Sequence, residues 1–215
     1  SNGLMVPSDD AWNFFLKEAM DNGSRPHVAF PDINKTYTST KLFGPFSRRL
    51  HDPRRPDYSE RLKELGLSPK PTEMEVLRAT GGILATDSYE FVTPIFIDED
   101  YFALDFFIAG WRYYDGERVI HQLKVGDTVH FLLENDNDKD NRAVIVMSMN
   151  GEKLGYIPAF YSGWMYEILK RNCDYKVRVA AIHPQAVPHR KVRISVVGIN
   201  IQDVLLEQED LLLVM

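Results

Sequence analysis

The sequence predicts an α+β protein. A small domain of mixed helices and strands, residues 8–97, precedes a six-stranded β-barrel, residues 100–200, and an acidic leucine-rich tail, residues 201–215. Two observations predict this division. The first part alternates short helical patterns with segments broken by proline and glycine, whereas the second part contains β-prone runs separated by Gly, Asp and Asn turns. Strands this short and closely spaced favour a small barrel over a parallel sheet.

The composition is that of a folded protein without a disulfide framework. Of the 215 residues, 44% are hydrophobic and 12% aromatic, which is ample for a packed core. The single cysteine, Cys173, excludes an internal disulfide and a cysteine-rich zinc motif, and the six histidines lack metal-site spacing. No run resembles a membrane span or a secretory leader. We therefore expect a cytoplasmic protein that uses no cofactor, metal or membrane.

The formal net charge of −6 has the wrong sign for a protein that coats nucleic acid without specificity. The charges are not evenly distributed. Residues 100–198 carry 13 Lys and Arg against 12 Asp and Glu, and both flanking parts are acidic. A local nucleic-acid site is therefore compatible with the composition of residues 100–198.

In the first part, Ser8 is placed to cap a helix that ends at Gly23 and carries one apolar face, formed by Trp12, Phe15, Leu16, Ala19 and Met20. Residues 25–40 predict one or two short strands. Asp57 is placed to cap a short helix that ends at Gly66.

Thr72 and Glu75 have the spacing of a capping box, which predicts a helix that stops at Gly81. The run from Tyr89 to Ile97, interrupted by Pro94, predicts a strand that leads towards the second domain.

In the second part, apolar residues at helical spacing after Pro158 predict one helix that ends near Asn172. Six segments have strand-like patterns: Leu104–Ala109, Thr128–Leu133, Arg142–Met149, Lys153–Ile157, Tyr175–Ile182 and Val192–Ile199.

Several motifs follow one another in a fixed order from Phe107 to Pro158: FIAGWRYYDG, the two strand-like runs of GDTVHFLLENDNDKDNRAVIVMS, and GEKLGYIP. This ordered set resembles the HIRAN domain, which occurs at the front of remodellers of the helicase-like-transcription-factor type and as a stand-alone bacterial domain. The resemblance spans residues 101–198. It implies an open OB-like or SH3-like barrel with one or two helices. Separately, residues 47–82 faintly resemble the amino-terminal subdomain of HipA-type toxin kinases, in which a short segment precedes a small helical pair and a GG turn, and this resemblance implies no activity.

Arg112, Tyr113 and Tyr114 form the first candidate site. In an extended strand, alternation sends the two tyrosines to opposite faces, so at least one ring is exposed unless the strand bends. An exposed ring beside a guanidinium suits base stacking and phosphate pairing. The alternative is that the rings belong to the core and its rim. The resemblance implies that this turn contacts the terminal nucleotides of single-stranded DNA.

The loop from Asn137 to Asp140 forms the second candidate site. A calcium loop is disfavoured, because the EF-hand glycine and bidentate glutamate are missing. The resemblance implies that Asp140 accepts a hydrogen bond from a free 3′-hydroxyl. The alternative is an aspartate that stabilises its own turn through backbone amides.

Three positions depart from the family's DNA-binding members. Lys139 stands in place of a tyrosine, and Tyr156 and Pro158 stand where a histidine and a lysine are expected. Tyr156 retains the ability to stack, and Lys139 to pair with a phosphate. Gly155 is expected to allow a tight approach between strands.

A cluster of four arginines is a secondary phosphate candidate, because guanidinium groups bind phosphate bidentately: Arg48, Arg49, Arg54 and Arg55. The alternative is a solvated connector tied to neighbouring acids, Asp52, Asp57 and Glu60.

The sequence contains no assembled catalytic constellation, so we expect a binding protein rather than an enzyme. The favoured function is recognition of single-stranded or broken DNA ends, including 3′-hydroxyl ends, as an accessory to bacterial DNA repair, restriction or mobile-element processing. The alternative is a protein–protein interaction module, of the toxin–antitoxin or phage and plasmid adaptor kind, that binds a partner through residues 201–215 and uses the barrel as a scaffold. Salt dependence separates the two functions, since only phosphate contacts weaken steeply with salt.

Overall fold

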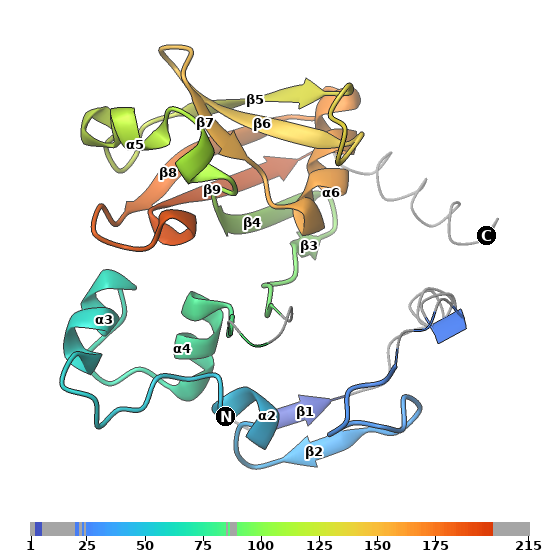
Figure 1. The fold of residues 1–215 in the computed structure, drawn as a ribbon. Helices are drawn as coiled ribbons and strands as arrows, with labels where there is room; N and C mark the ends of the chain where they lie inside the picture. Colours follow the sequence, from blue (N-terminus) through green and yellow to red (C-terminus); the bar gives the residue numbers. More distant parts are fainter. Residues whose placement is uncertain are drawn as a thin grey trace. The chain divides into compact units, whose positions relative to one another are not determined.

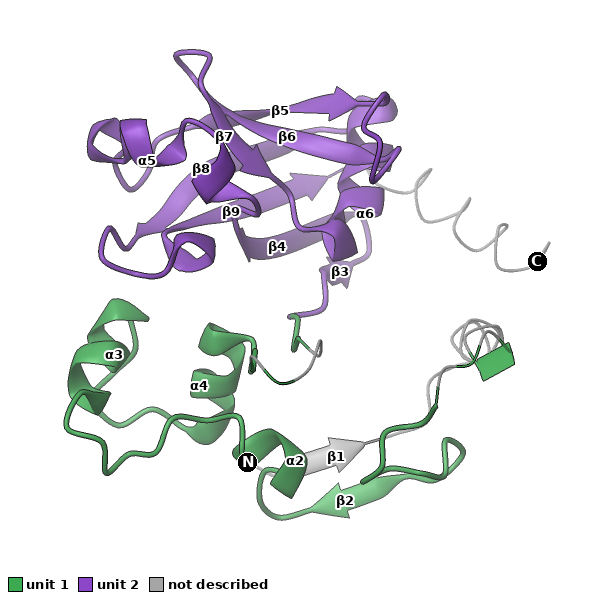
Figure 2. Ribbon diagram, viewed as in Figure 1, with its two compact units in different colours: residues 1–92 green, residues 93–215 purple. Residues whose placement is uncertain are grey.

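The structure is a computed structural model that describes residues 3–5, 20, 21, 23, 25–84, 86 and 90–199. The chain forms two compact units, residues 1–92 and 93–215 (Figures 1 and 2). Most of the helix predicted after Ser8 and the whole tail from residue 201 lie outside the described residues. None of the described helices has the length and apolar character needed to cross a membrane.

Unit 1 combines a two-stranded antiparallel sheet with short helices. Strand β1 (Gly3–Met5) pairs with β2 (Tyr37–Ser39), and helices α2 (Gly44–Ser47), α3 (Tyr58–Glu64) and α4 (Glu73–Thr80) follow. The Phe30 ring centroid lies 5.1–5.5 Å from those of Phe43, Phe46 and Tyr37; the contacts with Phe43 and Tyr37 are edge-on and the contact with Phe46 is tilted.

Of the caps predicted for α3 and α4, the cap of α4 is confirmed and that of α3 is not. The capping box of α4 is confirmed, because the Thr72 hydroxyl accepts from the Glu75 amide and the Glu75 carboxylate accepts from the Thr72 amide. Helix α3 does begin after Asp57, but the expected side-chain cap is wrong. The Asp57 carboxylate instead binds Arg55 and Arg61, and two guanidinium groups outcompete a backbone amide for its oxygens.

Unit 2 contains two antiparallel sheets. The four-stranded sheet has the order β3-β4-β9-β8 and the three-stranded sheet the order β5-β6-β7 (Figure 1). The strand bounds are β3 Phe96–Asp98, β4 Tyr101–Phe107, β5 Val129–Glu134, β6 Ala143–Ser148, β7 Lys153–Tyr156, β8 Tyr175–Ile182 and β9 Val192–Ile199. All six predicted segments contain a strand, and β3 is a seventh strand in the described part of the unit. Of the described residues 90–97 in the strand predicted from Tyr89 to Ile97, Phe96 and Ile97 belong to a sheet strand.

The two sheets do not close into one barrel among the described residues, which corrects the six-stranded barrel expected from the sequence. In the described part of the unit, backbone hydrogen bonds join them at two places. Ala109 and Tyr156 exchange two backbone hydrogen bonds of 2.9 Å, and Val179 bonds to the backbone of Gly126 and Asp127. The register between β8 and β9 shifts at Val179–Ala181, which begins at the residue that bonds to Gly126 and Asp127.

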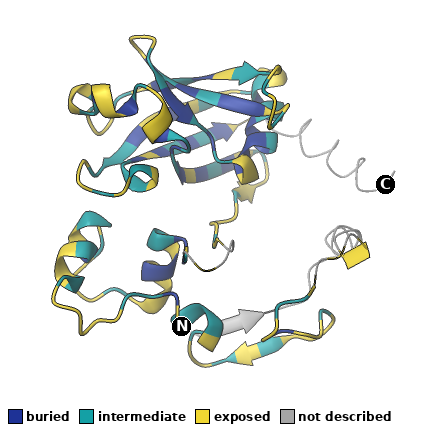
Figure 3. Ribbon diagram, in the orientation of Figure 1, coloured by how far each residue is buried: buried dark blue, intermediate teal, exposed yellow. Residues whose placement is uncertain are grey.

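The core of unit 2 lies between the two sheets and is covered at one end by α6 (Ala159–Lys170), as the buried residues in Figure 3 show. The predicted helix is confirmed, with Pro158 as its N-cap. Trp164 of α6 packs edge-on against Phe102 of β4, and Met165 and Ile168 are fully buried. This packing holds the loop before β6 and the start of α6 in one place.

Candidate functional site

The Arg112–Tyr114 segment is held by a short 3₁₀ helix, η1 (Trp111–Tyr113), that follows the left-handed residue Gly110. Trp111 is 1% exposed, and it fits because Gly116 has no side chain: a Cβ there would lie 2.5 Å from the indole ring. The segment is therefore a turn and not an extended strand, and the expectation that at least one of the two tyrosine rings is exposed is met. Because the backbone turns instead of alternating, Arg112, Tyr113 and Tyr114 are all exposed.

Arg112 and Tyr113 form the most exposed part of this turn. The Tyr113 side chain is 68% exposed, and the Arg112 guanidinium carbon lies 4.6 Å from the centroid of its ring. A guanidinium nitrogen of Arg112 also donates to the Tyr113 hydroxyl. In the described part of the chain, no carboxylate pairs with Arg112. The positive charge therefore remains available beside a flat ring.

The Tyr114 ring contacts the ring of Tyr156 of β7. Their ring centroids are 5.4 Å apart in an edge-on arrangement. The Lys153 ammonium lies over both rings, 4.5 Å from the Tyr114 centroid and 4.3 Å from the Tyr156 centroid. This cation joins the two rings into one small aromatic surface.

Below these rings, the Tyr156 hydroxyl is the centre of a hydrogen-bond network. It donates to Glu134 at 2.6 Å and accepts from Lys153 at 2.7 Å. The Asn137 amide donates to both Glu134, at 2.6 Å, and Tyr156, at 3.3 Å. Hydrogen bonds from Tyr156 and Asn137 lower the pKa of Glu134, whereas burial and the nearby Glu134 raise the pKa of Tyr156. The network thus holds an ionised carboxylate and a neutral phenol.

Sequence reasoning missed Glu134 and Lys153, whose side chains are each 23% exposed. Their position follows from strand pairing. Leu132 pairs with Ile145, which pairs with Tyr156, so Glu134, two residues beyond Leu132, lies on the same face as Tyr156. The sequence could have identified these two residues only if the register of β5, β6 and β7 had been known.

The Asn137–Asp140 loop is tied to its own backbone and to α6. The Asn137 side-chain oxygen accepts from the amides of Lys139 and Asp140. One Asp140 carboxylate oxygen accepts from the Arg142 amide at 2.9 Å and the other from the buried Ser162 hydroxyl at 2.7 Å. Asp140 therefore has the turn-stabilising contacts considered from the sequence, and each oxygen keeps a further lone pair.

The structure brings together the side chains of Tyr114, Asn137 and Tyr156, and Asp140 adjoins them through its backbone amide, which donates to Asn137. Lys139 is exposed and contacts the cluster only through its backbone amide. Gly155 confirms the tight approach expected of it: its φ is +146°, and an added Cβ would overlap the Ala109 carbonyl oxygen.

The four arginines of the secondary phosphate candidate lie in unit 1. Arg49 is buried and donates to the Gly82 carbonyl at 2.8 Å. Arg54 binds Asp52 bidentately and Arg55 binds Asp57 bidentately, as the connector alternative expects for these two side chains. Arg48 is exposed and has no ion pair with the residues described.

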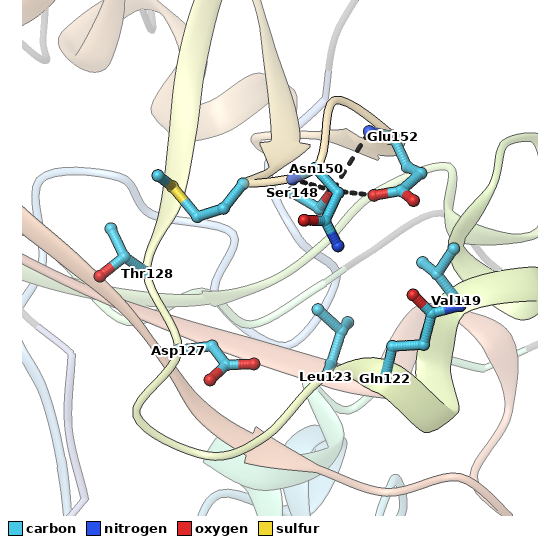
Figure 4. Close-up of a pocket in the computed structure, with 9 residues that line it drawn as sticks. Val119, Gln122, Leu123, Asp127, Thr128, Ser148, Asn150 and Glu152 are labelled. Carbon is cyan, nitrogen blue, oxygen red and sulfur yellow. Dashed lines mark hydrogen bonds between the residues drawn. The ribbon is translucent and has the colours of Figure 1, made fainter.

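A cavity of about 380 Å³ lies elsewhere in unit 2 (Figure 4). It is lined by Val119, Gln122, Leu123, Asp127, Thr128, Ser148, Met149, Asn150 and Glu152. None of the candidate residues is among them. The described residues also contain no group of three or more His, Cys, Asp or Glu side chains placed to hold a metal ion. The candidate site is a surface of rings and charges.

Comparison with known proteins confirms the resemblance drawn from the sequence. Residues 101–198 match the family model of the HIRAN domain, which covers less than half of the chain. A protein from Lactobacillus plantarum of solved structure is 22% identical, over 46% of this chain and 96% of its own, with a TM-score of 0.41. The HIRAN domain of human HLTF is 16% identical, over 50% of this chain and 85% of its own, with a TM-score of 0.40. No curated protein matches the chain.

Proposed function

We propose that residues 101–198 bind the end of a single-stranded nucleic acid, most simply DNA, and that the role is binding rather than catalysis. The observation that carries this proposal is the η1 turn, which exposes three successive side chains of the right chemistry. The match of the same residues to the HIRAN domain model supports it.

In the proposed complex, the Tyr113 ring stacks on a base near the end of the strand. Stacking of a base on an aromatic side chain is worth about 1–3 kcal/mol and tolerates any base. Arg112 lies beside this ring without a carboxylate partner in the described residues, so it can pair with the adjoining phosphate. The two residues together supply attraction that is independent of sequence.

The Tyr114–Tyr156 surface is proposed to receive the terminal nucleotide. Its hydrogen-bond network makes it rigid, so little side-chain entropy is lost when a base or sugar packs against it. Asp140 is proposed to accept a hydrogen bond from a terminal 3′-hydroxyl through a lone pair that Arg142 and Ser162 leave free. A terminal phosphate at the same place would instead meet the negative charge of Asp140, and the exposed Lys139 would pair with an internal phosphate.

Fluorescence anisotropy tests this proposal with single-stranded DNA that ends in a 3′-hydroxyl or a 3′-phosphate, at low and moderate salt. We expect tighter binding of the hydroxyl end, and affinity that falls with salt. The double variant Arg112→Ala/Tyr113→Ala is expected to lose binding of both ends without unfolding.

The matched control is Arg118→Ala/Tyr101→Ala, which removes an exposed arginine and an exposed tyrosine at other positions of the same unit. Its affinity should equal that of the wild type. Equal affinity of the Arg112/Tyr113 double variant and the wild type would refute the site. Binding that does not respond to salt would favour the protein-partner alternative.

A further inference from the structure

A second group of cations adjoins the η1 turn. The loop between β8 and β9 forms a 3₁₀ turn, η3 (Pro188–Arg190), near η1 in unit 2. The pKa of His189 is lowered by burial, by Arg190 and by Arg112, so the field of Arg112 reaches η3. The Arg190 guanidinium carbon lies 5.0 Å from the centroid of the Phe107 ring, at the end of β4.

The cations continue onto the outer face of the four-stranded sheet. Arg193 of β9 pairs in register with Phe107 of β4, and Arg178 of β8 pairs with Ser195 of β9. Along both strands the exposed residues alternate with buried ones, so Arg178 and Arg193 project from the same face. They are diagonal neighbours, about 7–8 Å apart at the backbone.

Few carboxylates lie near Arg178 and Arg193. Asp105 of β4 lies on the same face opposite Ser195, and Glu117 is already paired with Lys191 at 2.8 Å. Among the described residues, no carboxylate lies within ion-pair distance of Arg178 or Arg193. In a chain with a net charge of −6, neighbouring arginines without acids repel each other and attract a polyanion.

The acids of this sheet gather at its other end. Asp98 and Asp100 flank the turn between β3 and β4, and Asp174 precedes β8. The cations from Arg112 to Arg178 therefore form a positive track with a direction. The track begins at Arg112, passes η3, and ends on β8 and β9 before the acidic end of the sheet.

We propose that a nucleic-acid strand held by its end at η1 continues past η3 onto the outer face of β8 and β9, where Arg193 and Arg178 bind two further phosphates. This inference rests on the proposed function and adds the path of the strand beyond its end. The separation of the two arginines is about twice the 3.4 Å rise per nucleotide of a stacked strand, so they reach different phosphates.

Strand length tests the path. Anisotropy is measured with labelled single-stranded DNA of about 4 and about 12 nucleotides, which spans the site sizes of OB-type folds. The wild type should bind the longer strand more tightly. Arg178→Ala/Arg193→Ala should weaken binding of the longer strand only, and lower its log–log salt slope by about 1.4, because each phosphate contact with a single strand contributes about 0.7.

The control Lys70→Ala/Lys170→Ala removes two exposed cations outside the track and should change neither affinity. Equal affinities of the wild type for the two lengths would overturn the path and leave the end site intact. The variant Arg112→Ala/Tyr113→Ala should bind neither the short nor the long strand, which distinguishes the end site from the path. A wild type that binds neither strand would overturn both the proposed function and the path. A lower melting temperature of Arg178→Ala/Arg193→Ala with unchanged DNA affinities would show that the face packs against protein instead.

Discussion

Replacement of Gly155 by alanine tests how the two sheets are joined beneath the candidate site. Gly155 has a φ of +146°, a conformation that residues with a side chain rarely adopt. An alanine Cβ would overlap the Ala109 carbonyl oxygen and lie 2.7 Å from Cγ2 of Ile108. Relief of this overlap requires β7 to move away from Ala109, which breaks the two backbone hydrogen bonds between Ala109 and Tyr156.

The expected loss of stability follows from these two terms. A side chain in such a conformation costs about 1–3 kcal/mol. Each lost backbone hydrogen bond costs about 0.5–1.5 kcal/mol. Gly155→Ala should therefore destabilise unit 2 by about 2–6 kcal/mol. Gly151→Ala is the matched control, because Gly151 also has a positive φ, +90°, but no atom lies within 4 Å of an added Cβ. Gly151→Ala should therefore lose only the free energy that the unfavourable backbone conformation costs.

Urea unfolding measures both variants. Trp111 and Trp164 report on unit 2, and a Trp12→Phe background removes the only tryptophan of unit 1. With a slope of about 1–3 kcal/mol per molar urea, the loss of two hydrogen bonds should lower the unfolding midpoint of Gly155→Ala by at least about 0.3 M relative to Gly151→Ala. Equal midpoints for the two variants would refute the argument that close approach, rather than backbone conformation alone, requires this glycine.

Two further predictions concern the polar contacts of the site. Ser162→Ala should destabilise unit 2 by about 1–3 kcal/mol, because it leaves one oxygen of Asp140 without its buried donor; urea unfolding measures this, and an unchanged midpoint would contradict it. Glu134 has a pKa below its ordinary value of 4.5, so its contribution to stability is present above that pH and is lost as the pH falls through the folded-state pKa. Glu134→Gln should therefore be less stable than wild type at neutral pH and approach it in acid, and parallel pH profiles of the two unfolding midpoints would exclude this role.

Local sequence signals predicted the elements whose causes are local. The capping box at Thr72, the helix after Pro158 and the strands β4 to β9 follow from spacing and turn residues, and the structure has all of them. The same signals misjudged the Asp57 cap, since Arg61 lies one helical turn away and competes for its carboxylate.

The η1 turn illustrates a second limit. Alternation in an extended strand would place Tyr113 and Tyr114 on opposite faces and expose at least one ring; both rings are exposed, because Trp111 packs against Gly116 and the chain forms a 3₁₀ turn. Burial of one large ring outweighs the weak preference of neighbouring residues for an extended backbone.

The sequence alone determined which residue types are present for the proposed site: Arg112, Tyr113, Tyr114, Asn137, Asp140 and Tyr156. Only the tertiary structure decided how they meet. Pairing across β5, β6 and β7 brings Glu134 and Lys153 to Tyr156, and pairing across β4, β8 and β9 aligns Arg178 and Arg193 beyond η1. Such contacts depend on strand register, and register is set by the burial of a shared core rather than by the residues that meet on the surface.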